Sequence, residues 1–72
     1  MKWVKTENSL PEKEGHYLCK YKDDGDYGYT EPNSGFAVGE FIKRFKDFSF
    51  ITPRHSHMYA VEWMTTRLED IE

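Results

Sequence analysis

Histidine and cysteine are the side chains of this sequence that could bind a metal ion. His55 and His57 are separated by one residue, so an extended segment would place both imidazoles on one side, and His16 or Cys19 could add a third ligand. A zinc site needs three or four ligands held together. Two histidines in a loop that follows Pro53 are more commonly polar loop residues, and we therefore predict no metal site.

The acidic run Asp23-Asp24-Gly25-Asp26 resembles the start of a calcium-binding loop. An EF-hand loop closes its coordination sphere with a bidentate Glu at the twelfth position. Here that position holds Ser34 or Gly35, depending on whether the count starts at Asp23 or Asp24. Since the closing ligand is absent, the run predicts a solvated turn, in which Asp-Gly tolerates a positive φ.

The spacing of cysteine, histidine and serine in this sequence does not match an arrangement of catalytic residues. Cys19 and His16 are three residues apart, and in a strand this odd separation places them on opposite faces, where a thiolate and a base cannot pair. The serines lack a nucleophile elbow, and no glycine pattern that cradles phosphate is present. We predict a protein that is not an enzyme and has no cofactor, with Cys19 as a small core residue.

Basic and aromatic residues alternate between positions 41 and 48. The basic residues are Lys43, Arg44 and Lys46, and the rings are Phe41, Phe45 and Phe48. Such a cluster could hold an anionic group such as a nucleotide, or could stack on nucleic-acid bases. The alternative is a strand with its rings inward and its charges outward. We take the three basic residues as candidate anion contacts, and a net charge of −3 makes nucleic acid an unfavourable partner.

Tyrosines surround a segment that is rich in glycine and polar residues. Tyr21, Tyr27 and Tyr29 lie in or beside the stretch 26–35, which we interpret as a long loop. Tyrosines in loops of this composition make adaptable contact surfaces at low entropic cost. These three residues are candidate contacts with a partner protein, and the alternative is that they fold back over a thin core.

Four segments have the period-two alternation of strands that bury one face: His16–Lys22, Phe36–Arg44, Phe48–Ile51 and Met58–Met64. In the last segment, Tyr59, Val61 and Trp63 are expected on one face, and Trp63 is its largest side chain. In the first segment, Tyr17, Cys19 and Tyr21 share a face. The residues up to Pro11 are expected to form an irregular arm that packs Trp3 and Leu10 onto the core, and residues 12–15 a charged turn.

The stretch 41–48 has two interpretations. The spacing of Phe41, Phe45 and Phe48 fits a helix, whereas Phe41-Lys43-Phe45 also alternates as a strand does. Gly39 and the β-favouring neighbours support a strand through Arg44, followed by a turn near position 46. The predicted fold is mainly β: one small domain over residues 1–72, an antiparallel meander of three to four strands with room for one short helix, an α+β arrangement being the alternative.

Composition restricts what can hold this fold together. The chain has 72 residues and only three Leu, three Ile and three Val, against twelve aromatic residues, so rings must supply most of the core. A single cysteine excludes an internal disulfide and is typical of a reducing compartment. Without an apolar run that could form a signal peptide or a membrane span, we expect a cytoplasmic protein.

Several short motifs follow one another in a characteristic order: the chain opens with Trp3, reaches Leu10-Pro11 and closes with Val61-Glu62-Trp63-Met64. This order resembles a small phage and prophage family, the domain of unknown function numbered five-five-one. It departs from that family at Glu62, where the family often has His, and at 65–68, where the family has Pro-Leu-Pro. The resemblance implies a phage or mobile-element origin and a host-cytoplasm setting, and it transfers no activity.

Together these observations predict a non-enzymatic protein-interaction module that binds a host or phage protein or a second copy of itself. An exposed strand edge or the tyrosine-rich loop would provide the contact. The alternatives are a small-ligand or nucleotide binder that uses Lys43, Arg44 and Lys46, and, after that, a nucleic-acid binder.

Overall fold

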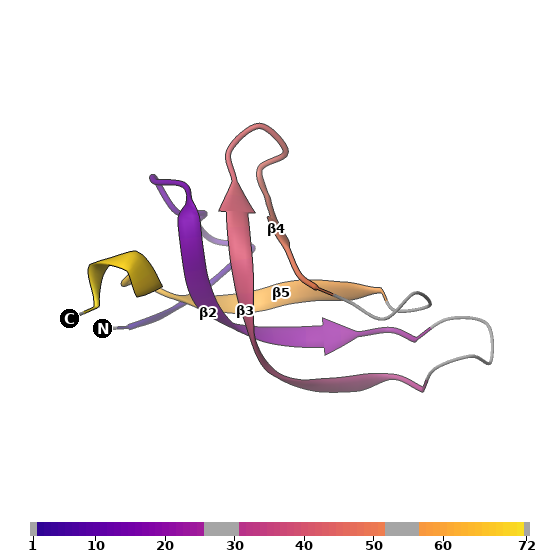
Figure 1. Ribbon diagram of the computed structural model, residues 1–72. Coiled ribbons are helices and arrows are strands. Elements are labelled where there is room, and N and C mark those ends of the chain that lie inside the picture. Colours follow the sequence, from indigo (N-terminus) through magenta and orange to yellow (C-terminus); the bar gives the residue numbers. More distant parts are fainter. Residues whose placement is uncertain (1, 26–30, 52–56, 72) are drawn as a thin grey trace.

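A computed structural model describes residues 2–25, 31–51 and 57–71 of the chain. It contains strands β1 (Trp3–Lys5), β2 (Gly15–Asp23), β3 (Asn33–Ile42), β4 (Asp47–Ser49) and β5 (Met58–Met64), and a short 3-10 helix, η1 (Leu68–Asp70). The strands form one antiparallel five-stranded sheet in the order β1-β5-β2-β3-β4 (Figure 1). The predicted mainly β, antiparallel class is therefore confirmed.

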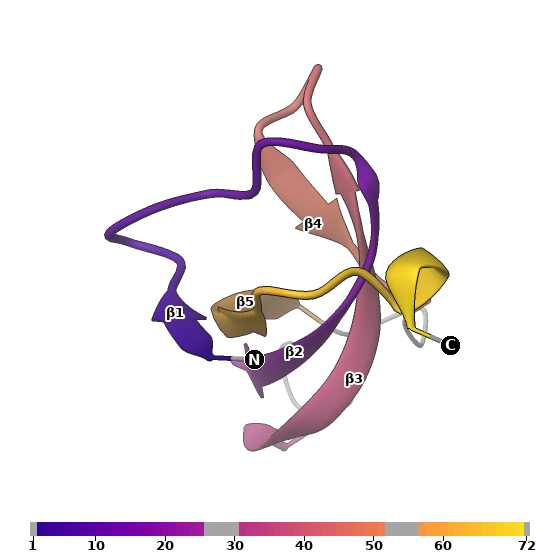
Figure 2. The same cartoon turned by 90° about the vertical axis from the view of Figure 1, so that its left-hand side faces the viewer.

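The sheet has more strands than the three to four expected, because short strands are recruited by pairing. Trp3–Lys5, which was expected to be part of an irregular arm with Trp3 packed onto the core, pairs with Met64–Glu62 of β5, and Val4 rather than Trp3 packs against the core. Three residues are too few to show an alternating pattern, so only the distant partner strand identifies β1. Figure 2 shows the chain looping out after β1 before it enters β2. The strand β3 also begins earlier than expected, at Asn33, where it pairs with Asp23.

The core is mainly aromatic, as the composition predicted. Its buried residues are Tyr17, Cys19, Phe41, Phe48, Ala60 and Trp63, with Val4, Leu10 and Phe50 packed against them. The Tyr17 ring meets Trp63 edge-on at 5.5 Å between centroids and meets Phe48 edge-on at 6.0 Å. Edge-to-face contacts at these separations add to the stabilisation from burial alone. Rings from four strands, β2, β3, β4 and β5, therefore close the interior where aliphatic side chains are scarce.

A bulge in β5 corrects the prediction that Tyr59, Val61 and Trp63 share a face. Lys20 pairs with Glu62 and the next residue, Tyr21, pairs with Ala60, so Val61 is an extra residue in β5. An extra residue reverses the alternation beyond it. As a result Ala60 and Trp63 both face the core, whereas Tyr59 is 43% exposed.

The stretch 41–48 is a strand, a turn and a second strand, and it contains no helix. The strand β3 ends at Ile42, and the turn 43–46 closes with Lys46 N–H donating to the Ile42 carbonyl at 2.9 Å. The expected strand through Arg44 and the expected returning strand at 48–51 are therefore wrong in their bounds, since β4 spans Asp47–Ser49. Phe41 and Phe48 face each other at 5.3 Å, and Phe45 lies outside at the turn.

The C-terminal segment is fastened to the beginning of β2. The Glu69 carboxylate accepts the backbone N–H of His16 at 2.9 and 3.1 Å and lies 3.1 Å from His16 Nδ1. Arg67 donates to both carboxylate oxygens of Asp70, at 2.9 and 3.0 Å, and to the Glu14 carbonyl at 2.9 Å.

Within the described residues no helix is long and apolar enough to cross a membrane.

Candidate interaction surface

The sheet face opposite the core carries an apolar patch that is open to solvent. We call it the outer face and define it by Trp3, Lys20, Phe36, Val38 and Glu62, which come from four strands. Phe36 is 65% exposed and Val38 is 47% exposed. These are large apolar side chains that the fold leaves in water, and exposed apolar groups that lie together on a protein surface are candidates for a contact site.

Neighbouring side chains hold the rings of the outer face in place. The Trp3 ring lies 5.9 Å from the Phe36 ring, and Lys20 Nζ sits 4.6 Å above the centre of the Trp3 ring. The same Lys20 amine lies 3.4 Å from the Glu62 carboxylate. A groove of about 290 Å³ runs beside Phe36, between it and Val61. The outer face is therefore an ordered surface with its charges already paired.

The edge of β3 is open next to this surface. The strand β4 pairs only with Glu40–Ile42, and within the described chain no strand pairs with the outer edge of Asn33–Gly39. In Figure 1 this half of β3 forms the lower margin of the sheet. An unpaired strand edge presents backbone donors and acceptors to any other extended chain.

Two hydrogen bonds donated by the backbone near the ends of β2 show which of its residues point away from β3, and therefore which backbone groups the open edge of β3 presents. The His16 N–H points to the Glu69 carboxylate, and the Asp24 N–H points to the His57 carbonyl at 3.2 Å. Both donors point away from β3, so even-numbered residues along β2 occupy the non-hydrogen-bonded pairs of the β2–β3 ladder.

The partners of these residues on β3 must also direct their backbone groups outward. Leu18 pairs with Val38, Lys20 with Phe36 and Lys22 with Ser34. The open edge therefore offers the N–H and C=O groups of Ser34, Phe36 and Val38. Two of these residues also carry the exposed apolar side chains.

The edge lacks the features with which proteins usually protect such strands. Asn33–Gly39 contains no charged residue and no proline, whereas protected edges carry lysine, proline or a bulge. Sequence-based reasoning missed Phe36 and Val38 as contact residues, although the uncharged run was visible. What it could not supply was the length of β4, which decides how much of β3 is left uncovered.

The candidate tyrosines are only partly within the described chain. Tyr21 is half-buried on the core side, where its ring lies 6.5 Å from that of Phe50. A methyl group on Gly35 would come within 3.2 Å of the Tyr21 hydroxyl, so this ring covers the backbone of β3. Tyr27 and Tyr29 lie outside the described residues, as do Asp26 and His55.

The candidate anion contacts lie together on an exposed turn. Lys43, Arg44 and Lys46 all belong to the β3–β4 connection, and the Arg44 guanidinium stands 5.6 Å from the Phe45 ring. Phe45 is 67% exposed, but the other two phenylalanines of the pattern are buried. The turn thus presents one ring and three cations, and the groove beside Phe36 is lined by other residues.

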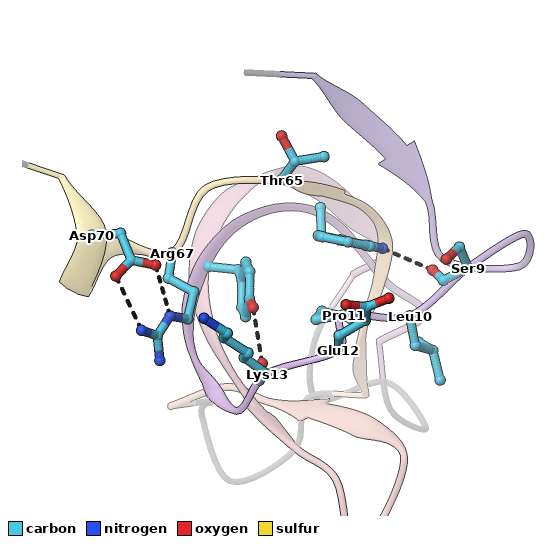
Figure 3. Close-up of a pocket in the computed structure, with 10 residues that line it drawn as sticks. Ser9, Leu10, Pro11, Glu12, Lys13, Thr65, Arg67 and Asp70 are labelled. Atoms are coloured by element: carbon cyan, nitrogen blue, oxygen red, sulfur yellow. Dashed lines mark hydrogen bonds and ion pairs between the residues drawn. The ribbon is translucent and has the colours of Figure 1, made fainter.

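A larger pocket of about 410 Å³ lies between the N-terminal loop and the C-terminal segment (Figure 3). Two of the polar groups in its lining are engaged in the fold: the Tyr17 hydroxyl donates to the Lys13 carbonyl at 2.8 Å, and Trp63 Nε1 donates to the Ser9 carbonyl at 2.9 Å. Burial raises the pKa of the Tyr17 hydroxyl, which keeps it protonated as a donor. These two hydrogen bonds anchor the N-terminal loop to β2 and β5.

In the described part of the chain, the side chains that could bind a metal ion lie apart from one another or accept hydrogen bonds from the backbone. Across residues 2–25, 31–51 and 57–71, no group of three His, Cys, Asp or Glu side chains could hold a metal ion. Cys19 is fully buried while His16 is on the opposite, solvent-facing side of β2. Asp23 is buried, and its Oδ1 accepts the N–H groups of Gly25 at 2.8 Å and His57 at 3.1 Å. Its carboxylate thus stabilises the end of β2.

No family model, curated protein or solved structure matches this chain. The resemblance to the phage and prophage family therefore stays a prediction. The outer face and the open edge of β3 are the candidate functional surface of the described chain.

Proposed function

We propose that this chain is a non-enzymatic protein-interaction module that binds an extended polypeptide segment along the edge of β3. The observation that carries the proposal is the uncharged, unpaired edge Asn33–Gly39 beside two exposed apolar side chains. The proposed setting is the cytoplasm of a host cell. The family resemblance implies a phage or mobile-element origin, and the single cysteine is typical of a reducing compartment.

Strand addition would use two kinds of contact. The backbone groups of Ser34, Phe36 and Val38 would hydrogen-bond the incoming strand and provide affinity. Alternate side chains of that strand would lie on the outer face against Phe36 and Val38, where they provide selectivity. The fitting segment is therefore extended and apolar at every second residue.

The second candidate function, anion binding at the β3–β4 turn, is favoured by one observation: the exposed Phe45 ring beside Arg44. A nucleotide phosphate would pair with Lys43, Arg44 or Lys46 while its base stacks on that ring. Backbone NMR shifts confined to this turn on addition of a nucleotide would support this function, and the absence of such shifts would argue against it. Nucleic acid as the ligand would require steep loss of binding with salt.

The strand-addition proposal can be tested with a display library of random peptides, using variants that change only the edge. Val38→Pro removes an outward N–H, and because this N–H does not point to β2, the β2–β3 ladder is retained. Val38→Lys keeps the backbone and adds an edge-protecting charge. We expect the wild-type protein to select peptides with alternating apolar residues and both variants to lose them.

The matched control for these variants is Phe45→Ser, because Phe45 is as exposed as Phe36 but lies away from the edge. It should leave peptide selection unchanged. If the selected peptides bind Val38→Pro and Val38→Lys as well as they bind the wild type, the edge is not the binding site. If no peptide is selected by the wild-type protein, that result counts against strand addition from a foreign chain.

A further inference from the structure

We infer that the polypeptide which the β3 edge fits is a second copy of this chain, paired antiparallel about a twofold axis at Phe36. This inference rests on the proposed function and names the partner of the same edge. It would join two sheets into one continuous sheet, with the β3 strands in the middle.

The register follows from the direction of the backbone groups. Ser34, Phe36 and Val38 present their N–H and C=O groups outward, so each must face an even-numbered residue of the second copy to form close hydrogen-bonded pairs. Pairing Phe36 with Phe36 of the second copy also pairs Ser34 with Val38 and Val38 with Ser34. Every outward group of the open edge then finds a partner.

The open edge of β3 begins and ends at the residues that this register requires. On one side the strand β4 begins to cover β3 at Glu40, so pairing must stop at Gly39. Twofold symmetry about Phe36 then requires it to stop at Asn33 on the other side, which is where β3 begins. A register centred on Gly35 or Ala37 would leave part of the edge unpaired or would meet β4.

The side chains are compatible with self-association as well. A twofold axis perpendicular to the sheet keeps the two outer faces on the same side, so Phe36 would lie beside Phe36 of the second copy, with each Trp3 ring behind it. Asn33–Gly39 has no charge, so no like charges are brought together in the new ladder. Lys20, the cross-strand neighbour of Phe36, is already paired with Glu62.

The geometry also predicts the strength and the size of the assembly. The paired segment is about 20 Å long at ~3.3 Å per residue, which is a small interface and points to a reversible, concentration-dependent dimer. Each copy uses its open β3 edge once, and a twofold contact of this kind closes on itself. The assembly should therefore stop at the dimer.

Sedimentation equilibrium over a range of concentrations tests the association. We expect a monomer–dimer equilibrium for the wild-type protein and for Phe45→Ser, and a dissociation constant at least about tenfold higher for Val38→Pro and Phe36→Ser. Thermal unfolding of each variant verifies that the fold is retained, and Val38→Lys provides a second edge variant if Val38→Pro does not fold.

Disulfide trapping tests the register. A mixture of the Ser34→Cys and Val38→Cys proteins should form a crosslinked heterodimer, because paired Cα atoms lie about 5.5 Å apart, within the range of a disulfide. Each variant alone should not crosslink, since the identical positions are then four residues apart along the ladder, about 13 Å. The wild-type protein controls for Cys19, which is buried.

The two proposals fail in different ways. A wild-type protein that remains monomeric at every concentration, or a dimer in which Ser34→Cys crosslinks with itself, overturns the second-copy inference. If such a monomer still selects peptides that the edge variants lose, the proposed function stands with a foreign partner. If it selects none, both are overturned.

Discussion

The Cys19 thiol illustrates how position decides the chemistry of a residue. It lies on the core face of β2 and is fully buried between strands, close enough to Gly39 that a methyl group there would come within 3.3 Å of the sulfur. Burial raises the pKa of the thiol to about 12. Since the thiolate is the reactive form, the folded protein holds this cysteine inert.

We therefore expect N-ethylmaleimide to modify Cys19 slowly at neutral pH in the folded protein and rapidly after denaturation. Mass spectrometry of the alkylated protein over time measures both rates. Modification of the native protein at the rate of the unfolded chain would show that the thiol is accessible, and would contradict its assignment to the core.

At the scale of elements, the C-terminal segment stabilises the beginning of β2 through its carboxylates. The hydrogen bond from the His16 backbone N–H lowers the pKa of Glu69, and the hydrogen bonds from Arg67 lower the pKa of Asp70. A carboxyl whose pKa is lower in the folded state than in the unfolded state stabilises the fold above its unfolded pKa. That contribution is lost as pH falls through the folded value.

The stability of the protein should consequently decrease between about pH 5 and pH 2, and Glu69→Gln should flatten part of this decrease because its amide cannot be protonated there. Melting temperatures measured across this range provide the comparison. Glu7→Gln, at an exposed position of the N-terminal loop, removes the same charge and should keep the wild-type slope. Equal slopes for all three proteins would mean that Glu69 does not hold the segment in solution.

At the scale of the whole molecule, stability depends on a few rings. Trp63 is 7% exposed, packs edge-on against Tyr17 and donates its indole N–H to the Ser9 carbonyl, so it joins β5 to β2 and to the N-terminal loop. A chain of this length buries only about 60% of its unfolded surface, so its margin of stability is small. The burial of one aromatic ring is thus a large share of the total free energy of unfolding.

Trp63→Ala should remove ~3–5 kcal/mol, which is comparable to the low end of the ~5–15 kcal/mol expected for a whole domain. We expect this variant to be unfolded at room temperature by circular dichroism and denaturant titration. Phe45→Ala, which removes an exposed ring, should change the free energy of unfolding by less than ~0.5 kcal/mol. A cooperative Trp63→Ala transition within a few degrees of the wild type would refute the aromatic-core account.

Period-two alternation predicted correctly which side chains face the core wherever the residues of a single strand decide this. The alternation of Tyr17, Cys19 and Tyr21 on β2 predicted their shared face, and the alternating run around Trp63 predicted its burial. The placement of the rings at 41, 45 and 48 stayed open until the structure showed Phe41 and Phe48 buried and Phe45 exposed. Two errors arose where a partner strand intervened: Tyr59 was misplaced because the bulge at Val61 reverses the alternation, and β1 was missed because only its pairing with β5 defines it.

The sequence by itself determined the class of the fold and the material of its core, because side-chain size and period-two alternation are local properties that survive in any arrangement of the strands. Only the tertiary structure decided the strand order, the bulge in β5 and the open edge Asn33–Gly39. These depend on which strands meet and how long each partner is, and such long-range pairing is not encoded in any single stretch of the chain.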